Sequence, residues 1–158
     1  MHTDDEKFLQ QAIFLAIENV KLGRGGPFGA VIVKDGKVIA TGTNLVTSSN
    51  DPTAHAEMSA IRNACKSLSN FQLEGCTIYS SCEPCPMCLA AIYWARPQRL
   101  VFASDKNQAA DAGFADAFIY QEIVLPLEQR TLQTENITLE DAEKPFFAWK
   151  NNDEKIEY

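Results

Sequence analysis

Residues 52–57 read Pro-Thr-Ala-His-Ala-Glu, and residues 81–88 read Ser-Cys-Glu-Pro-Cys-Pro-Met-Cys. The two stretches offer one imidazole, His55, and two thiols, Cys85 and Cys88, which are ligand types that zinc prefers. Three protein ligands leave the fourth position of a tetrahedral zinc ion open, and an open position is typical of a catalytic site. We therefore predict one zinc ion per subunit, bound by His55, Cys85 and Cys88. Glu57 adds a carboxylate that need not touch the metal.

Both stretches are predicted to lie at the start of helices. Residues 54–68 have a helix-forming composition, which puts His55 and Glu57 in the first turn of a helix. Residues 76–80 form a short apolar strand, and Pro86, a residue type favoured at helix starts, opens a second helix. The first amides of a helix are unpaired and carry partial positive charge, so both helix starts favour anionic groups.

The rest of the chain predicts a mixed α/β fold. Apolar residues recur at three- and four-residue steps between residues 8 and 20, as in an amphipathic helix. Strand-forming runs over residues 30–34 and 37–41 flank Asp35-Gly36, a strong signal for a two-residue hairpin turn. Further elements are expected as a strand over residues 100–103, a strand over residues 115–125, a loop over residues 44–50, and helical pieces over residues 127–130 and 140–150. We predict a three-layer α/β/α architecture with a mixed central sheet of about five strands, in a single domain spanning residues 1–158.

The composition is that of a soluble globular protein. Of 158 residues, 46% are hydrophobic and 22% are charged, and no apolar run approaches the roughly 18 residues of a membrane span. The five cysteines are odd in number and three fall within seven residues, which fits metal binding in a reducing compartment better than a disulfide framework. Without a signal-peptide pattern, we expect a cytoplasmic protein with no membrane partner. A net charge of −7 disfavours nucleic acid as a partner, because the surface as a whole repels phosphate.

The order His-x-Glu followed by Pro-Cys-x-x-Cys is the signature of zinc enzymes that deaminate nucleobases. Zinc lowers the pKa of a bound water toward ~7, and Glu57, two residues after His55, is placed to move protons between that water and a substrate. Each residue alone has an ordinary interpretation. A lone histidine is more often structural, a lone Cys-x-x-Cys is commonly a redox motif or half of a structural zinc site, and a glutamate at a helix start often only complements the helix dipole. Their joint order favours the deaminase interpretation. The second histidine, His2, lies at a terminus, where chains are often poorly ordered.

Cys82 leaves two other interpretations open. Together with Cys76, Cys85 and Cys88 it could complete a closed site of four cysteines, which would make the protein a structural zinc-binding module. This alternative predicts that Cys82→Ser releases zinc and that His55→Ala does not. In the other alternative the Cys-x-x-Cys pair is a redox dithiol, which predicts a metal-free protein.

Stretches within and beyond the metal motif indicate which kind of deaminase the chain resembles. They are residues 25–30 (Gly-Gly-Pro-Phe-Gly-Ala), 50–57, 93–97 (Tyr-Trp-Ala-Arg-Pro), 112–114 (Ala-Gly-Phe), 118–120 (Phe-Ile-Tyr) and the terminal Tyr158. Through them the whole chain resembles the bacterial guanine deaminases of the cytidine deaminase superfamily. The metal motif alone is shared with tRNA adenosine deaminases and cytosine-type deaminases. The resemblance implies a cytidine deaminase-like fold and the zinc-dependent hydrolysis of guanine to xanthine and ammonia in purine catabolism, with water adding at C2 and Glu57 shuttling the protons.

The resemblance also implies which residues contact the small-molecule purine base. They are Phe28, Asn44, Ala56, Trp94, Asp116 and Tyr158. Asn44 and the backbone of Ala56 would hold the purine, the three aromatic side chains would pack around its ring, and Asp116 would be a second catalytic acidic group. By position alone, Phe28 and Trp94 are equally well explained as ordinary core residues. Likewise, Asn44 could be a turn residue, Asp116 a solvated carboxylate and Tyr158 part of a frayed terminus.

The resemblance further implies a homodimer in which the tail of residues 150–158 is exchanged between subunits and covers the partner's site. The alternative functions are adenosine deamination in tRNA and a cytosine-type deaminase. The acidic balance of the chain disfavours an RNA substrate, because RNA binding requires a basic groove.

Overall fold

The computed structural model describes residues 3–158, with side chains from Asp4 onward, so that His2 lies outside the described residues. The chain divides into two compact units between Ile119 and Tyr120. The first unit holds the sheet and its covering helices, and the second spans Tyr120–Tyr158. The prediction of a single domain with an exchanged tail of residues 150–158 stays a prediction.

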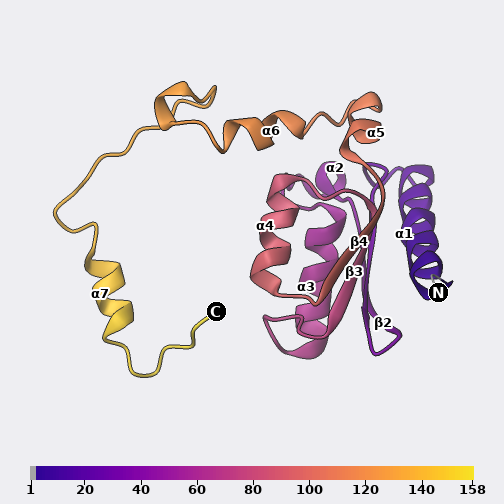
Figure 1. The fold of residues 1–158 in the computed structure, drawn as a ribbon, viewed down its shortest axis with the longest axis horizontal. Coiled ribbons are helices and arrows are strands. Elements are labelled where there is room, and N and C mark those ends of the chain that lie inside the picture. Colours follow the sequence, from indigo (N-terminus) through magenta and orange to yellow (C-terminus); the bar gives the residue numbers. More distant parts are fainter. Residues whose placement is uncertain (1–2) are drawn as a thin grey trace. The chain divides into compact units, whose positions relative to one another are not determined.

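The first unit is built on a four-stranded mixed sheet (Figure 1). Its strands are β1 (Gly29–Lys34), β2 (Lys37–Thr43), β3 (Cys76–Cys82) and β4 (Arg99–Ser104), in the order β2-β1-β3-β4. Strand β1 pairs antiparallel with β2 and β3, and β3 pairs parallel with β4. The β1–β2 hairpin turns at Asp35 and Gly36, whose φ angles of 50° and 71° match the predicted two-residue turn. The helix over Pro86–Ala95 connects β3 to β4 in a parallel strand-helix-strand crossover.

Helices cover both faces of this sheet, which confirms the three-layer α/β/α prediction (Figure 1). Helix α1 (Thr3–Lys21) packs on one face, and α3 (Ala56–Leu68) and α4 (Pro86–Ala95) cover the other. Alternate residues of each strand point to opposite faces. Thus Val31 and Tyr79 pack with α1, whereas Ile32 and Ile78 belong to the core beneath α3 and α4.

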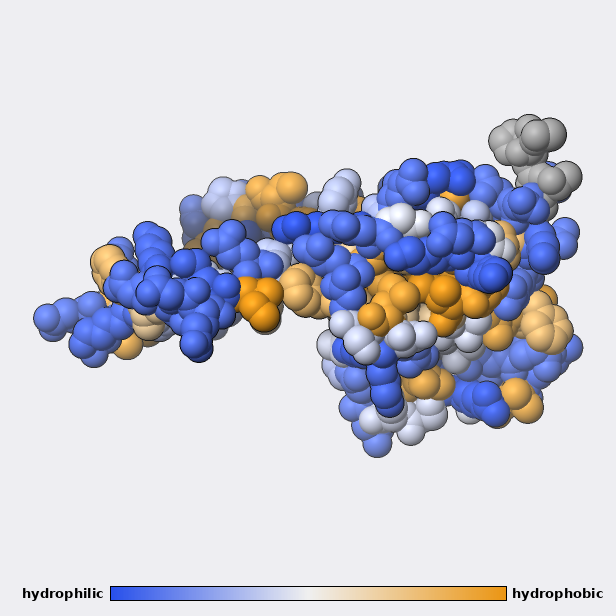
Figure 2. Space-filling model, turned by 90° about the horizontal axis from the view of Figure 1, so that it is seen from below, coloured by the Kyte–Doolittle hydropathy of each residue, from blue (hydrophilic) through white to orange (hydrophobic). Residues whose placement is uncertain are grey.

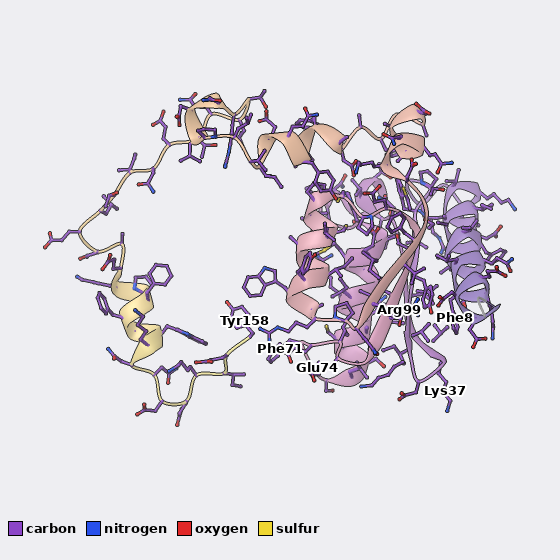
Figure 3. All side chains as sticks on the ribbon, in the orientation of Figure 1. Phe8, Lys37, Phe71, Glu74, Arg99 and Tyr158 are labelled. Atoms are coloured by element: carbon purple, nitrogen blue, oxygen red, sulfur yellow. The ribbon has the colours of Figure 1, made fainter. Side chains whose placement is uncertain are left out.

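Helix α1 is held to the sheet by an apolar and a polar contact. The ring of Phe8, which is labelled in Figure 3, packs on that of Tyr79, with centroids 5.1 Å apart. The Tyr79 hydroxyl donates a hydrogen bond of 2.6 Å to Asp5, and Arg99 forms an ion pair of 2.9 Å with the same carboxylate. Burial, followed by the hydrogen bond to Asp5, raises the pKa of Tyr79 to about 12.

Helix α3 lies directly against the sheet because small residues face each other there. Ala60 and Ala64 are fully buried on the helix, and Gly42 of β2 lies directly against the helix backbone. A Cβ atom on Gly42 would collide with the carbonyl oxygen of Ala56 and the amide nitrogen of Ala60. This close packing fixes the start of α3, where His55 and Glu57 lie.

Two expectations about secondary structure are wrong. Residues 115–125 do not add a fifth strand, because α6 (Ala117–Glu122) forms there. A short apolar run does not distinguish helix from strand by pattern alone. Residues 44–50, expected as a loop, contain the short helix α2 (Val46–Ser49). Helix α5 (Lys106–Asp111), which no pattern predicted, begins with a capping box between Asp105 and Gln108.

The second unit contains little regular secondary structure, and most of its side chains are exposed. It contains the 3₁₀ turn η1 (Leu127–Gln129) and α7 (Lys144–Lys150), which agree with the predicted helical pieces. The rings of Trp149 and Tyr158 meet edge to face with centroids 6.4 Å apart. Hydrophobic patches interrupt the hydrophilic surface of the protein (Figure 2). In the second unit, the side chains of Phe146 and Tyr158 are 67% and 68% exposed. None of the described helices is long and apolar enough to cross a membrane.

Candidate active site

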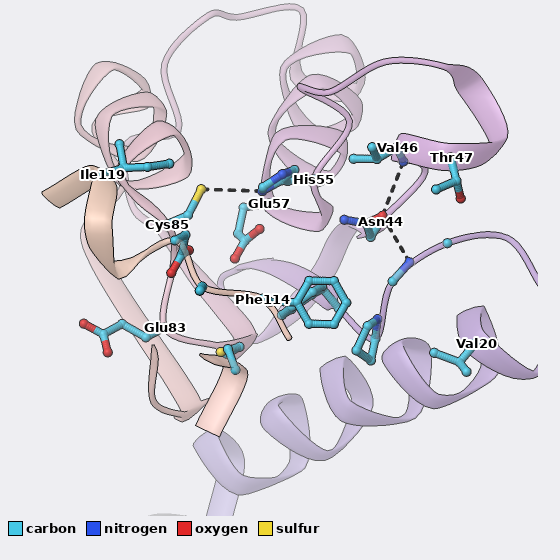
Figure 4. Close-up of a pocket in the computed structure, with 18 of the residues that line it drawn as sticks. Val20, Asn44, Val46, Thr47, His55, Glu57, Glu83, Cys85, Phe114 and Ile119 are labelled. Atoms are coloured by element: carbon cyan, nitrogen blue, oxygen red, sulfur yellow. Dashed lines mark hydrogen bonds between the residues drawn. The ribbon is translucent and has the colours of Figure 1, made fainter. Parts of the chain in front are cut away.

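The candidate metal ligands come from two helix starts. His55 is the N-cap residue of α3 and Cys85 is the N-cap residue of α4, both in extended backbone conformation. Cys88, in the first turn of α4, donates its backbone N–H to the Cys85 sulfur at 3.5 Å. The Nδ1 atom of His55 lies 3.5 Å from the Sγ atom of Cys85 (Figure 4). It also lies 3.5 Å from the Sγ atom of Cys88. The structure therefore brings the three predicted ligands together.

The donor set fits a zinc ion. One ligand atom from each of the three residues lies within 4.8 Å of the others, and both cysteines are buried. The hydrogen bond from the Cys88 thiol, together with that from His55, lowers the pKa of Cys85 to about 4. Cys85 is thus a thiolate at neutral pH, which is the form that binds a metal. One nitrogen and two sulfur ligands leave one tetrahedral position for water or substrate.

Glu57 lies beside these ligands with its carboxylate almost fully buried. It is 5% exposed, and its Oε1 atom accepts a hydrogen bond of 2.8 Å from the Ser80 hydroxyl of β3. Burial raises the pKa of Glu57 above its ordinary value. A raised pKa makes the carboxylate a stronger base, which suits a group that takes a proton from water.

His55, Cys85 and Glu57 line a cavity of about 720 Å³ (Figure 4). Its walls come from the end of α1, the glycine-rich loop before β1, the start of α2 and the segment after α5. Phe28 and Phe114 form an apolar wall, with ring centroids 4.9 Å apart and an interplanar angle of 87°. A flat ring fits against such aromatic faces.

Asn44 is fixed so that its amide N–H groups are available to the cavity. Its Oδ1 atom accepts hydrogen bonds from the backbone N–H groups of Gly26 at 3.2 Å and Val46 at 3.3 Å. The buried Asn19 side chain binds the backbone carbonyls of both segments, with 2.9 Å to Gly26 and 2.8 Å to Asn44. Gly25 must lack a side chain, because a Cβ atom there would collide with the Asn44 carbonyl oxygen. Asn44 therefore presents Nδ2 as a hydrogen-bond donor.

Asp116 is one of three carboxylates in the cavity wall, together with Glu57 and Glu83. Burial, and then the negative charge of Cys85, raise the pKa of Asp116 above its ordinary value. The cavity thus combines an amide donor, Asn44, with a carboxylate acceptor, Asp116. A heterocycle that has both ring acceptors and N–H donors matches this pair.

Three residues predicted to contact the substrate are not among the residues that line the cavity. Ala56 is fully buried at the start of α3 and does not line the cavity. Trp94 is 63% exposed on α4 and is also absent from the cavity wall. Tyr158 belongs to the second unit. The roles predicted for these three residues stay predictions.

Two site residues escaped the sequence interpretation. Phe114 lines the cavity, but the sequence offered only its place in the Ala-Gly-Phe stretch and no role. Ser80 forms a hydrogen bond with Glu57. It is a small residue within a buried strand, and no sequence pattern around it indicates a role in the site.

Cys82 lines the cavity without joining the metal ligands. Among the described residues, the cluster able to hold a metal consists of His55, Cys85 and Cys88. The Cys82 thiol instead lies 3.6 Å from the carbonyl oxygen of Asp105, and burial raises its pKa to about 11. This arrangement does not support a closed site of four cysteines.

Comparison with known proteins identifies the class. Residues 2–104 match the family of the cytidine and deoxycytidylate deaminase zinc-binding region. The protein belongs to this family, and the matched residues include His55, Cys85 and Cys88. The predicted cofactor, zinc, and the predicted cytidine deaminase-like fold are therefore confirmed.

Individual relatives of known activity give more detail than the family as a whole. The chain is 58% identical to guanine deaminase from Bacillus subtilis over 97% of its own length and 98% of the relative's. The X-ray structure of the B. subtilis enzyme matches with a TM-score of 0.95 over the same shares of the two chains. A guanine deaminase structure from Nitrosomonas europaea matches at 31% identity and a TM-score of 0.66, over 69% of this chain and 63% of that one. A tRNA-specific adenosine deaminase from Haemophilus influenzae is 45% identical over 67% of this chain and 62% of its own.

Proposed function

We propose that this protein catalyses the zinc-dependent hydrolytic deamination of guanine to xanthine and ammonia, in purine catabolism. The observation that carries the proposal is the 58% identity to a guanine deaminase over 97% of the chain, well beyond the shared metal-binding region. The tRNA-specific adenosine deaminase from H. influenzae matches only 67% of this chain. The net charge of −7 also disfavours an RNA substrate.

The metal is held by His55, Cys85 and Cys88. When bound there, zinc supplies a Lewis acid that lowers the pKa of a water molecule to near 7 and makes it a nucleophile at neutral pH. The thiolate character of Cys85 and the burial of both cysteines suit this binding. The protein's own groups then position the base and move the protons.

Glu57 performs the proton transfers. Its carboxylate accepts a proton from the attacking water and delivers it to N3 of guanine as the oxygen bonds to C2. It then transfers the second proton of the water to the departing amine, which leaves as ammonia. The oxygen of the water becomes the C2 carbonyl oxygen of xanthine, so atoms and charges balance.

Asn44 and Asp116 recognise the base. Asn44 donates from Nδ2 to a ring acceptor, and Asp116 accepts from the N–H groups beside C2. Phe28 and Phe114 pack against the ring and exclude water from it. Because a base without those N–H donors leaves a partly buried carboxylate unpaired, Asp116 favours guanine over adenine.

The substrate is tested by offering guanine, adenine, cytosine, cytidine, guanosine and an adenosine-containing RNA stem-loop to the purified protein. We expect ammonia release from guanine to exceed that from every other compound by at least about 10²-fold, because a site built around hydrogen bonds strongly rejects analogues that lack them. Faster turnover of the RNA or of cytosine would establish the corresponding alternative instead.

We also propose that the protein is a cytoplasmic homodimer that exchanges residues 150–158 between subunits, so that Tyr158 contacts the base bound by the partner. Two features support this proposal. All five cysteines are free thiols, as in a reducing compartment. The second unit leaves aromatic side chains such as Phe146, Phe147 and Tyr158 more than half exposed, and a second subunit would cover them. Light scattering would test the dimer.

A further inference from the structure

We propose that Ser80 is a positioning residue for Glu57, fixing one carboxylate oxygen so that the other carries the protons. This inference rests on the proposed function, in which Glu57 is the proton shuttle. It concerns a residue that neither the metal motif nor the cavity wall includes.

The hydrogen-bond geometry gives the Ser80 hydroxyl a single orientation. Ser80 is 1% exposed, and its Oγ atom lies 2.8 Å from Oε1 of Glu57 and 3.5 Å from the backbone nitrogen of Cys82. A backbone N–H can only donate, so Oγ accepts from Cys82. The single hydroxyl proton therefore points to Glu57, and water does not compete for it at this depth.

Glu57 needs such a partner because its side chain is flexible. A glutamate has three rotatable side-chain bonds, and a proton transfer requires the donor and acceptor atoms to lie within about 3 Å of each other. The bond from Ser80 holds Oε1, which sets the orientation of the carboxylate and thus the place from which Oε2 takes and returns protons. Misplacement of a reacting group by about 1 Å can cost about 10²-fold in rate.

The same contact joins the two halves of the site. Ser80 lies on β3, two residues before the end of the strand that leads to Cys85 and Cys88. Glu57 lies on α3, next to His55. The Ser80 to Glu57 hydrogen bond therefore sets the carboxylate relative to the segment that supplies both sulfur ligands.

Ser81 provides a matched control on the same strand. Ser81 is also buried, with 7% of the residue exposed. Its Oγ atom, however, accepts a hydrogen bond of 3.0 Å from the backbone N–H of Gly29. Ser80 and Ser81 point to opposite faces of β3. Ser81→Ala removes a buried hydroxyl of the same kind without touching Glu57.

The test compares Ser80→Ala, Ser80→Thr and Ser81→Ala in the full-length, zinc-loaded protein, with guanine as substrate. Bound zinc, the melting temperature, kcat and KM are measured for each variant. We expect Ser80→Ala to keep its zinc and a KM within about twofold, while kcat falls about 10- to 100-fold. Ser80→Thr, which keeps the hydroxyl, should recover most of the rate, and Ser81→Ala should lower the melting temperature while keeping kcat.

Wild-type activity and the variants answer separate questions. If the wild-type protein does not deaminate guanine, the proposed function fails before Ser80 is considered. If it does, the inference is overturned by a Ser80→Ala variant with wild-type kcat, or by a loss of rate that follows the loss of zinc. It is equally overturned if Ser81→Ala lowers kcat as much, or if a folded Ser80→Thr protein is as slow as Ser80→Ala.

Discussion

The Nδ1 atom of His55 and the Sγ atom of Cys85 lie 3.5 Å apart although 30 positions separate the two residues in the chain. The contact exists because α3 and α4 begin side by side at one edge of the first unit, each with its N-cap residue facing the other. Two helix starts thus provide a nitrogen ligand and two sulfur ligands.

His55→Ala should lose both bound zinc and activity, because two thiols alone do not hold the ion. Cys82→Ser should keep its zinc, because the Cys82 thiol lies against Asp105 rather than among the ligands. Metal analysis of the two purified variants checks this. Zinc retained by His55→Ala and lost by Cys82→Ser would restore the structural-module interpretation.

Glu57→Gln should separate metal binding from catalysis. The amide keeps the shape of the side chain but cannot shuttle protons, so zinc should remain bound while kcat on guanine falls about 10²- to 10⁴-fold. Zinc content and steady-state kinetics on one preparation decide the matter. Full activity in the variant would show that another group moves the protons.

Asp116→Ala should weaken guanine turnover because the cavity loses the acceptor for the N–H groups beside C2. Removal of a hydrogen bond to a charged group should lower kcat/KM about 10- to 100-fold. Asp111→Ala is the matched control, because Asp111 is an exposed carboxylate at the end of α5 that does not line the cavity. Equal kinetics for the two variants would remove Asp116 from substrate recognition.

Removal of residues 151–158 should leave a folded protein that keeps its zinc and loses activity on guanine by at least about tenfold, because the closing tail and Tyr158 are gone. Circular dichroism, metal analysis and kinetics on the truncated protein test this. Unimpaired turnover would contradict the proposed exchange of the tail.

Tyr79 should make the protein less stable at alkaline pH. Its pKa is raised from 10.0 to about 12, so between these values the folded protein keeps a proton that the unfolded chain has lost. Its contribution to stability is therefore complete below pH 10 and is lost as the pH rises through 12. Tyr79→Phe should have a melting temperature with a weaker dependence on pH between 10 and 12. Parallel curves for the two proteins would contradict the shift.

The metal ligands were predictable because each lies in a short local motif. His55 and Glu57 are two residues apart, Cys85 and Cys88 three, and both pairs start helices that the composition also predicts. Ser80 and Phe114 join the site only through the packing of β3 and of the segment after α5, which no local pattern encodes. The expected fifth strand was wrong for a similar reason, since residues 115–125 are apolar enough for either type of element.

Reconstitution with zinc tests the central claim most directly. Metal-free protein, prepared with a chelator, is titrated with Zn²⁺ while ammonia release from guanine is followed. Activity should rise in proportion to added zinc and level off at about one ion per chain, because the site has three protein ligands and one open position. Guanine turnover that is independent of zinc, or zinc binding at this stoichiometry without any guanine turnover, would contradict it.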